Sequence, residues 1–174
     1  MKEQIINGIK YRLNEDTLTA KVIQDHDNDY NGDIVIPKKV EFEKLSYCVT
    51  SIGDWAFDGC EYLISITIPD GVISIGDSAF WGCKKLATVT IPDSVKIIGN
   101  QAFFACSSLT SITIPDSVKI MGESAFENCI SLEIITYIGT PTQWNNWQRG
   151  NAWRHNTPSK IVVEPMAMLI NGIN

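Results

Sequence analysis

Apolar and polar residues along this chain follow a block pattern that returns every 23 residues. Each block contains one leucine and one phenylalanine at fixed places: Leu63, Leu86, Leu109 and Leu132, and Phe57, Phe80, Phe103 and Phe126. A fixed period of this length predicts a solenoid, in which each coil buries its apolar face against its neighbours. Four such blocks are clear between residues 52 and 137.

The block from residue 109 to 131 shows how one coil is expected to fold. Its opening sequence, Leu-x-x-Ile-x-Ile, predicts a short parallel strand over residues 111–114, which a Pro-Asp turn ends. Because side chains alternate along a strand, Ile112 and Ile114 should face inward and Thr113 outward.

The second half of the same coil is expected to bend at Gly122, where a Cβ would be awkward. A short helical turn should begin at Glu123, and its equivalents in the other coils should cap the same turns: Asp54, Asp77 and Asn100. Ala125, Phe126 and Cys129 should then face the core.

One cysteine column follows the repeat: Cys60, Cys83, Cys106 and Cys129. Neighbouring coils would bring these backbones within disulfide range, but the Cβ vectors would point the same way, which is poor geometry for a bridge. We therefore interpret them as small buried residues. The remaining cysteine, Cys48, is expected to be buried in a strand.

The repeated motif Leu-x-x-Ile-x-Ile-Pro-Asp-Ser-Val-x-x-Ile-Gly-x-x-Ala-Phe-x-x-Cys resembles the BspA-like leucine-rich repeat family, also described as the Treponema pallidum type. The resemblance covers residues 52–137, where four copies keep both the period and the residue types. It implies a right-handed leucine-rich-repeat solenoid, mainly β with short helical turns. It also implies adhesion and protein binding by a protein that is secreted or lies on a bacterial cell surface.

Three segments are expected within one structural domain. Residues 1–51 should form an N-terminal β cap with an irregular first coil, residues 52–137 the four regular repeats, and residues 138–174 a C-terminal cap with an apolar tail. In the N-terminal cap, alternation of apolar and polar residues over 8–13 and 18–24 predicts a β-hairpin.

Two stretches depart from the period. Residues 41–50 alternate and should form an extra strand pair or a protruding hairpin, either a binding edge or a solvated loop. A Thr-Pro-x-Gln sequence beginning at residue 140 predicts a capped helix that runs to about residue 149, followed by a closing strand over 159–164. Three tryptophans near this helix should plug the last coil, the alternative being a carbohydrate platform: Trp144, Trp147 and Trp153.

The strand face, expected to be concave, carries the first set of candidate binding residues. Its outward positions form a threonine column with a flanking column: Thr67, Thr90, Thr113 and Thr136, and Ser65, Thr88 and Ser111. Such a face suits an extended peptide or a glycan. It equally suits a β-favouring ladder that only stabilises the sheet.

The convex side carries the second set. Adjacent coils place Trp81 and Phe104 where the other copies carry Asp58 and Glu127. Exposed aromatic patches mark partner surfaces, whereas packing under a neighbouring loop would make the pair structural. Two isoleucines are expected near this patch: Ile97 and Ile120.

A column of aspartates follows the strands: Asp70, Asp93 and Asp116. Stacked carboxylates can bind calcium, but Pro-Asp is also an ordinary turn dipeptide. We expect no metal site and no cofactor.

Composition narrows the class of function. The chain has 174 residues, 44% of them hydrophobic and 20% charged, which is typical of one soluble domain. Its net charge of −6 argues against nucleic acid as a partner, and no apolar stretch is long enough to span a membrane. The first residues lack the features of a signal peptide, so a cytoplasmic or phage-borne location stands beside the surface location that the resemblance implies.

Catalytic motifs are missing from the sequence. The only two histidines, His26 and His155, fall in opposite caps, and no nucleophile elbow or phosphate-binding loop is present. We therefore expect a binding scaffold for a protein or a glycan rather than an enzyme. The alternative is a structural subunit of a cell envelope or phage particle that self-associates through its apolar tail, at Met166, Met168, Leu169 and Ile170.

Overall fold

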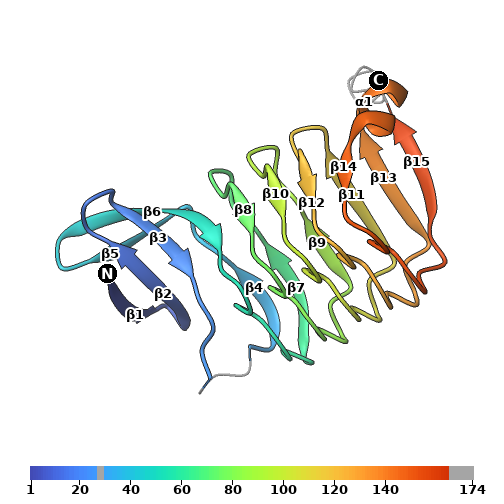
Figure 1. Ribbon diagram of the computed structural model, residues 1–174. Helices are drawn as coiled ribbons and strands as arrows, with labels where there is room; N and C mark the ends of the chain where they lie inside the picture. Colours follow the sequence, from blue (N-terminus) through green and yellow to red (C-terminus); the bar gives the residue numbers. More distant parts are fainter. Residues whose placement is uncertain (27–29, 165–174) are drawn as a thin grey trace, which may run out of the picture.

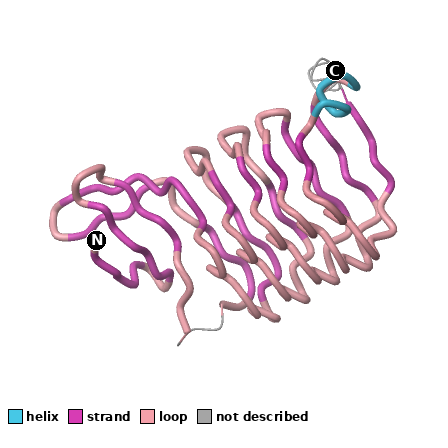
Figure 2. Tube along the Cα trace, in the orientation of Figure 1, coloured by secondary structure: helices cyan, strands magenta, loops and turns pink. Residues whose placement is uncertain are grey.

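Stacked coils run along one axis between an N-terminal β cap and a last coil that carries helix α1 (Figure 1). The computed structural model describes residues 1–26 and 30–164. The apolar tail, with Met166, Met168, Leu169 and Ile170, therefore lies outside the described residues. The strands are short and are separated by turns and loops (Figure 2), because each coil changes direction repeatedly.

Each regular coil contributes one strand to each of two parallel sets. The first set contains β4 (Gly32–Val35), β7 (Leu63–Thr67), β9 (Thr88–Thr90), β11 (Ser111–Pro115), β13 (Ile134–Ile138) and β15 (Lys160–Glu164). The second set contains β6 (Leu45–Ile52), β8 (Ser74–Ile75), β10 (Ile97–Ile98), β12 (Ile120–Met121) and β14 (Gln148–Arg149). Equivalent residues of successive coils are paired directly, as in Ile112↔Ile135↔Ile161.

Antiparallel strands close the N-terminal end. Strands β2 (Ile9–Asn14) and β3 (Thr19–Val22) form the predicted hairpin, and β3 then pairs in parallel with β6. Strand β1 (Lys2–Ile6) adds an edge to β2 and was not predicted. Its side chains alternate between half-buried and exposed, so the hydrophobic signal in its sequence is weak.

The insert at residues 41–50 belongs to a hairpin that follows β4, as predicted. Strand β5 (Lys39–Phe42) pairs antiparallel with β6 through a two-residue turn, Glu43-Lys44. Both turn residues have positive φ, at 48° and 67°, the conformation that tight two-residue hairpin turns prefer. The prediction for Cys48 was wrong: it lies in β6 but is exposed, because its neighbours Tyr47 and Val49 take the inward positions.

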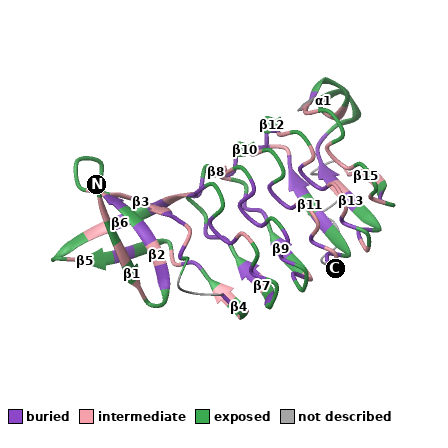
Figure 3. Cartoon of the chain, turned by 60° about the horizontal axis from the view of Figure 1, so that its bottom comes forward, coloured by how far each residue is buried: buried purple, intermediate pink, exposed green. Residues whose placement is uncertain are grey.

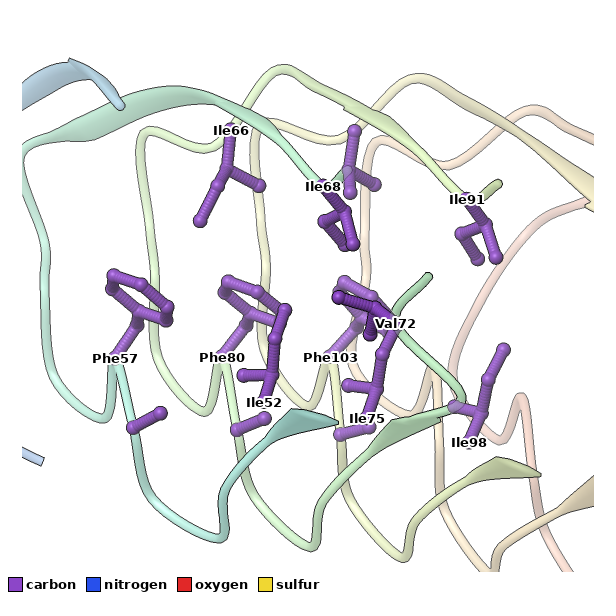
Figure 4. Packing of buried hydrophobic residues seen from close by; sticks show 14 of the residues in the cluster. Ile52, Phe57, Ile66, Ile68, Val72, Ile75, Phe80, Ile91, Ile98 and Phe103 are labelled. Atoms are coloured by element: carbon purple, nitrogen blue, oxygen red, sulfur yellow. The ribbon is translucent and has the colours of Figure 1, made fainter. Parts of the chain in front are cut away.

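The core is a set of columns that run the length of the stack (Figure 4). The four phenylalanine rings are fully buried and nearly parallel, with centroid distances of 5.2, 5.1 and 5.3 Å. Tyr30 covers the first ring and Trp153 the last. The leucine column is also fully buried. Buried residues line the inside of every coil and exposed ones its outer side (Figure 3).

The prediction that short helical turns begin at Asp54 and its equivalents was wrong. The next residue in each coil has positive φ, at 60°, 51°, 54° and 54°: Trp55, Ser78, Gln101 and Ser124. A right-handed helix cannot contain such a residue. The backbone groups of these turns bond to the neighbouring coil instead, as when Phe57 N–H donates to the Ala79 carbonyl at 2.8 Å.

One glycine in each coil allows the coils to approach closely. The column is Gly53, Gly76, Gly99, Gly122 and Gly150. A Cβ on Gly99 would lie 2.6 Å from the Asp77 nitrogen of the preceding coil. None of these five glycines has positive φ. Glycine is therefore required here because space is missing, not because the backbone is left-handed.

The C-terminal segment, predicted to be a cap, completes a further coil. Strand β14 pairs in parallel with β12, and Phe126 N–H donates to the Trp153 carbonyl as each earlier Phe N–H donates to the next alanine. Helix α1 (Pro141–Asn146) is inserted into this coil, with the predicted capping box of Thr140 and Gln143. The helix ends three residues before the expected position.

Candidate functional site

The aromatic pair of Trp81 and Phe104 lies in the turns that precede β9 and β11. The two rings are stacked, with centroids 5.8 Å apart and planes 2° apart. Trp81 is 39% exposed, and Phe104 is half-buried. The pair therefore presents a stacked aromatic edge to solvent.

The turn backbone explains why two aromatics can stack there. Gly82 N–H donates to the Phe104 carbonyl at 2.8 Å, and Gly59 N–H donates to the Trp81 carbonyl at 2.8 Å. The same bonds recur in the other coils, so side chains at this position lie in one row: Asp58, Trp81, Phe104, Glu127 and His155. An acid stands on either side of the aromatic pair in this row.

The two flanking acids differ in their surroundings. The Glu127 carboxylate lies 3.5 Å from Nδ1 of His155. Among the described residues, one buried carboxylate oxygen of Asp58 has no hydrogen-bond partner, and desolvation raises the pKa of this carboxyl group. The row therefore joins an aromatic surface to one unsatisfied carboxylate.

The predicted threonine columns lie on the first set of strands, and their outward side is called here the threonine face. Thr67 pairs with Thr90, and Thr113 with Thr136. All four point away from the core; Thr136 is half-buried and the others are exposed. Two valines extend the column at its ends, Val35 opposite Thr67 and Val162 opposite Thr136.

The flanking column on the threonine face is mixed in chemistry. Ser65, Thr88 and Ser111 lie on it as predicted, and Ser65 Oγ donates to the Asp33 carboxylate at 2.5 Å. Ile134 and Lys160 continue the same column towards the C-terminal end. The face can offer hydroxyl groups to a ligand, but one serine is already engaged within the protein.

The structure does not bring the two candidate surfaces together. The threonines belong to strands, whereas Trp81 and Phe104 belong to turns, and among the described residues no hydrogen bond or ring contact joins the two groups. Ile97 and Ile120, expected near the pair, are paired with each other on β10 and β12 and point outward there.

The cysteine column is buried and free of disulfides, as interpreted. Its thiols also act as donors: those of Cys83, Cys106 and Cys129 donate to phenylalanine carbonyls of an earlier coil at 3.0–3.2 Å. In the last coil, Thr157 Oγ1 takes this role towards the Phe126 carbonyl at 2.5 Å. Burial raises the pKa of the Cys129 thiol to about 12, so this column is structural.

The aspartate column is engaged in turns. Asp70 pairs with Lys38 at 2.9 Å, while Lys96 and Lys119 donate to the backbone carbonyls of Asp93 and Asp116. Within residues 1–26 and 30–164, no three histidine, cysteine, aspartate or glutamate side chains meet as metal ligands would.

The three C-terminal tryptophans close the end of the core. Trp147 is buried, and Trp144 and Trp153 pack against the core cluster. Their rings contact Tyr137 and Phe126 at 5.2–6.3 Å. The three tryptophans therefore plug the end of the core.

The six residues of α1, the one helix in the part of the chain described, fall far short of a bilayer span.

Two exposed aromatics, Trp55 and Tyr62, were not predicted as surface residues. Trp55 is 46% exposed and Tyr62 is 54% exposed, with the Lys85 ammonium 4.5 Å from the Tyr62 ring centroid. Trp55 could have been found, because its column otherwise holds Ser78, Gln101 and Ser124.

The chain matches the family model described as BspA type leucine rich repeat region, in six copies over residues 37–148. No curated protein matches it.

Solved bacterial structures share the fold. The T. pallidum leucine rich repeat protein is 28% identical, with a TM-score of 0.74 over 92% of this chain and 71% of that protein. A leucine-rich repeat protein from Bacteroides capillosus is 30% identical, with a TM-score of 0.68 over 80% of this chain and all of that protein. A leucine rich cell surface protein from Faecalibacterium prausnitzii is 27% identical, with a TM-score of 0.62 over 95% of this chain and 55% of that protein.

Proposed function

Because this chain belongs to the BspA-type leucine-rich repeat family, we propose that it is a non-catalytic scaffold that binds a protein or glycan partner. The proposed setting is adhesion or host interaction by a secreted or surface-held bacterial protein. The likeness to a cell surface protein of F. prausnitzii supports this setting. Repeat folds present extended surfaces for such contacts.

The observation that carries the proposal is the stacked pair of Trp81 and Phe104. Both replace an acid in a row that is otherwise polar, and Trp81 is exposed and Phe104 half-buried although the core has its own aromatic stack. Aromatic side chains are enriched at the energetic centres of interfaces. The threonine face is the second surface through which binding is proposed, at Thr67, Thr90, Thr113, Thr136, Ser65, Thr88 and Ser111.

A catalytic alternative has little support in the described structure. His26 follows β3 in the N-terminal cap, whereas His155 lies in the last coil, where its carbonyl accepts from Asn128 N–H. The burial that raises the thiol pKa values of Cys106 and Cys129 works against a reactive thiolate. A scaffold role accounts for the same residues without a reaction.

The test is a binding screen of the purified chain against a glycan array and a panel of host surface proteins. The variant Trp81→Ala/Phe104→Ala removes the pair. Trp55→Ala is the matched control, because Trp55 is a comparably exposed tryptophan outside the row. Circular dichroism and the melting temperature establish that all forms are folded.

The expected result is a partner that binds the wild type and the Trp55→Ala control but loses at least about tenfold in affinity with the double variant. Equal binding by all three forms would remove the pair from the proposal. A partner lost only on Thr90→Lys/Thr113→Lys would move the site to the threonine face.

The assembly role rests on Met166, Met168, Leu169 and Ile170, which lie outside the described residues. Sedimentation of the full chain beside a chain ending at residue 165 separates the two roles. A scaffold should be monomeric in both forms, whereas an assembly subunit should lose its oligomer on truncation.

A further inference from the structure

A row of charged side chains crosses the outer side of the N-terminal cap. Glu3 on β1 is paired with Arg12 on β2, and Arg12 is paired with Lys21 on β3. Lys10 lies two residues from Arg12 and points to the same side. Two cations directly opposite each other in a sheet repel, so this arrangement is costly unless an anion lies between them.

Glu3 neutralises only part of the positive charge of Lys10, Arg12 and Lys21. Its carboxylate accepts from Arg12 at 2.7 and 3.2 Å and lies 3.9 Å from the Lys10 ammonium. The hydrogen bond from Arg12 also lowers the pKa of Glu3, so its negative charge is retained. Among the described residues, no carboxylate lies within ion-pair distance of Lys21. The Lys21 ammonium is therefore available to an external anion.

These side chains line a hollow of about 280 Å³ at the junction of the cap and the first coil. Gly53 and Asp54 also line it. The stem of Lys21 lies over Gly53, with Cε 2.6 Å from the place where a Cβ would be. Glycine at 53 thus leaves room for the stem of Lys21 in the hollow.

The backbone N–H of Asp54 is the second feature of this hollow. In three later coils the equivalent N–H donates to a side-chain oxygen of the coil before: Asp77 N–H donates to Asp54 Oδ1, Asn100 N–H to Asp77 Oδ1, and Glu123 N–H to Asn100 Oδ1, at 2.7–3.1 Å. For Asp54 N–H, no acceptor occurs among the described residues. Gln24 stands in the cap where these side chains stand in the coils, but among the described residues it makes no hydrogen bond to Asp54 N–H.

We propose that this hollow binds an oxyanion, a sulfate, phosphate or carboxylate group. The anion takes the place of the side-chain oxygen that accepts from the equivalent N–H in the later coils. One anion oxygen would accept from Asp54 N–H, as an aspartate oxygen does in the next coils. Lys21 and the unused N–H groups of Arg12 would bind the others, since charge-assisted bonds from such groups favour anions. The site depends on neither the aromatic pair nor the threonine face.

The experiment is a titration of the full chain with sodium sulfate at constant ionic strength, followed by the amide resonances of Asp54 and Asp77 in NMR spectra. The Asp77 amide is the internal control, because it already has an acceptor. The variant Lys21→Gln removes the free ammonium. Lys160→Gln is the matched control, because Lys160 is exposed on β15 at the other end of the stack.

The expected result is a saturable shift of the Asp54 amide that exceeds the shift of Asp77, with affinity reduced about tenfold in Lys21→Gln and unchanged in Lys160→Gln. No shift at Asp54, or equal affinities in the two variants, would overturn the proposal. A glucose 6-sulfate titration then identifies the source. Tighter binding than that of inorganic sulfate assigns a sulfated saccharide, and equal binding assigns the free ion.

Discussion

At the scale of single residues, one turn position shows how this fold separates structure from surface. Asp58, Trp81, Phe104, Glu127 and His155 all occupy it, although their side chains have little in common. The neighbouring backbone bonds fix the turn, so the side chain is free to change. Chemistry at this position can therefore differ between coils without a change of fold.

Phe103→Ala is expected to be a severe single substitution. Phe103 is fully buried between the rings of Phe80 and Phe126, and its removal leaves a cavity that the rigid coils cannot fill. The free energy of unfolding should fall by about 3–5 kcal/mol. Phe104→Ala, one residue on and half-buried, should cost about 1 kcal/mol. Urea denaturation of both variants checks this, and equal losses would contradict it.

Asp58→Asn should stabilise the protein at neutral pH. Burial raises the pKa of Asp58 above its ordinary value of 3.8, so the folded state binds the proton more tightly than the unfolded state. The ionised side chain thus lowers stability as pH rises through the folded pKa. The variant should gain about 1 kcal/mol near pH 7, a gain that disappears as pH falls below 3.8.

Denaturation curves at several pH values measure this gain. Asp93→Asn, at an exposed turn position, serves as the control. A stabilisation of Asp58→Asn that did not change with pH would contradict a titrating origin.

At the scale of elements, the regular strands could be predicted because each inward column is repeated four times. The turns could not be predicted, because Asp54 and its equivalents suit two arrangements. Such residues can begin a helix, or their side chains can accept from an N–H of the next coil, as they do in this protein. That choice depends on the neighbouring coil, which local sequence does not contain.

The last coil was hidden for a related reason. Inserting α1 displaces the repeat, and the residues that take the core positions differ: Thr157 replaces a cysteine, and Trp153 replaces an alanine. The backbone bonds persist where the residue types do not.

The candidate sites follow the same division. Trp81 and Phe104 could be found in the sequence, because they interrupt an acidic column. The hollow beside Lys21 could not, because it needs the pairing of Arg12 with Lys21 and the N–H of Asp54, for which the described residues provide no acceptor. Neither is visible without the strand register.

Two glycines should respond differently to alanine. In Gly99→Ala the new Cβ would lie 2.6 Å from the Asp77 nitrogen, so the coils must separate and stability should fall by about 3 kcal/mol. Gly82 has φ +67° but open space around it, and Ala105 occupies the same position one coil on with φ 56°. Gly82→Ala should therefore cost about 1 kcal/mol. Thermal unfolding compares the two, and a larger loss at Gly82 would refute the steric explanation.

At the scale of the whole molecule, each coil contacts only its neighbours, so a coil should be removable. Deleting residues 78–100 joins Asp77 to Gln101, which follows an equivalent position in the next coil. The shortened chain should fold with the same type of circular dichroism spectrum. Its urea m-value should be smaller by about one coil's share of the buried surface. A chain that fails to fold would show that the coils are not equivalent.

The direction of the bonds between coils has a mechanical consequence. They all lie along the stack, and β1 and β15 are at its opposite ends (Figure 1). A pulling force applied between these ends loads the coil interfaces in series, so that they separate one after another instead of shearing together. Each coil of 23 residues would release about 80 Å of chain. A molecule held at one end and bound at the other would extend in equal steps under load, and each step would limit the force that reaches the bound partner.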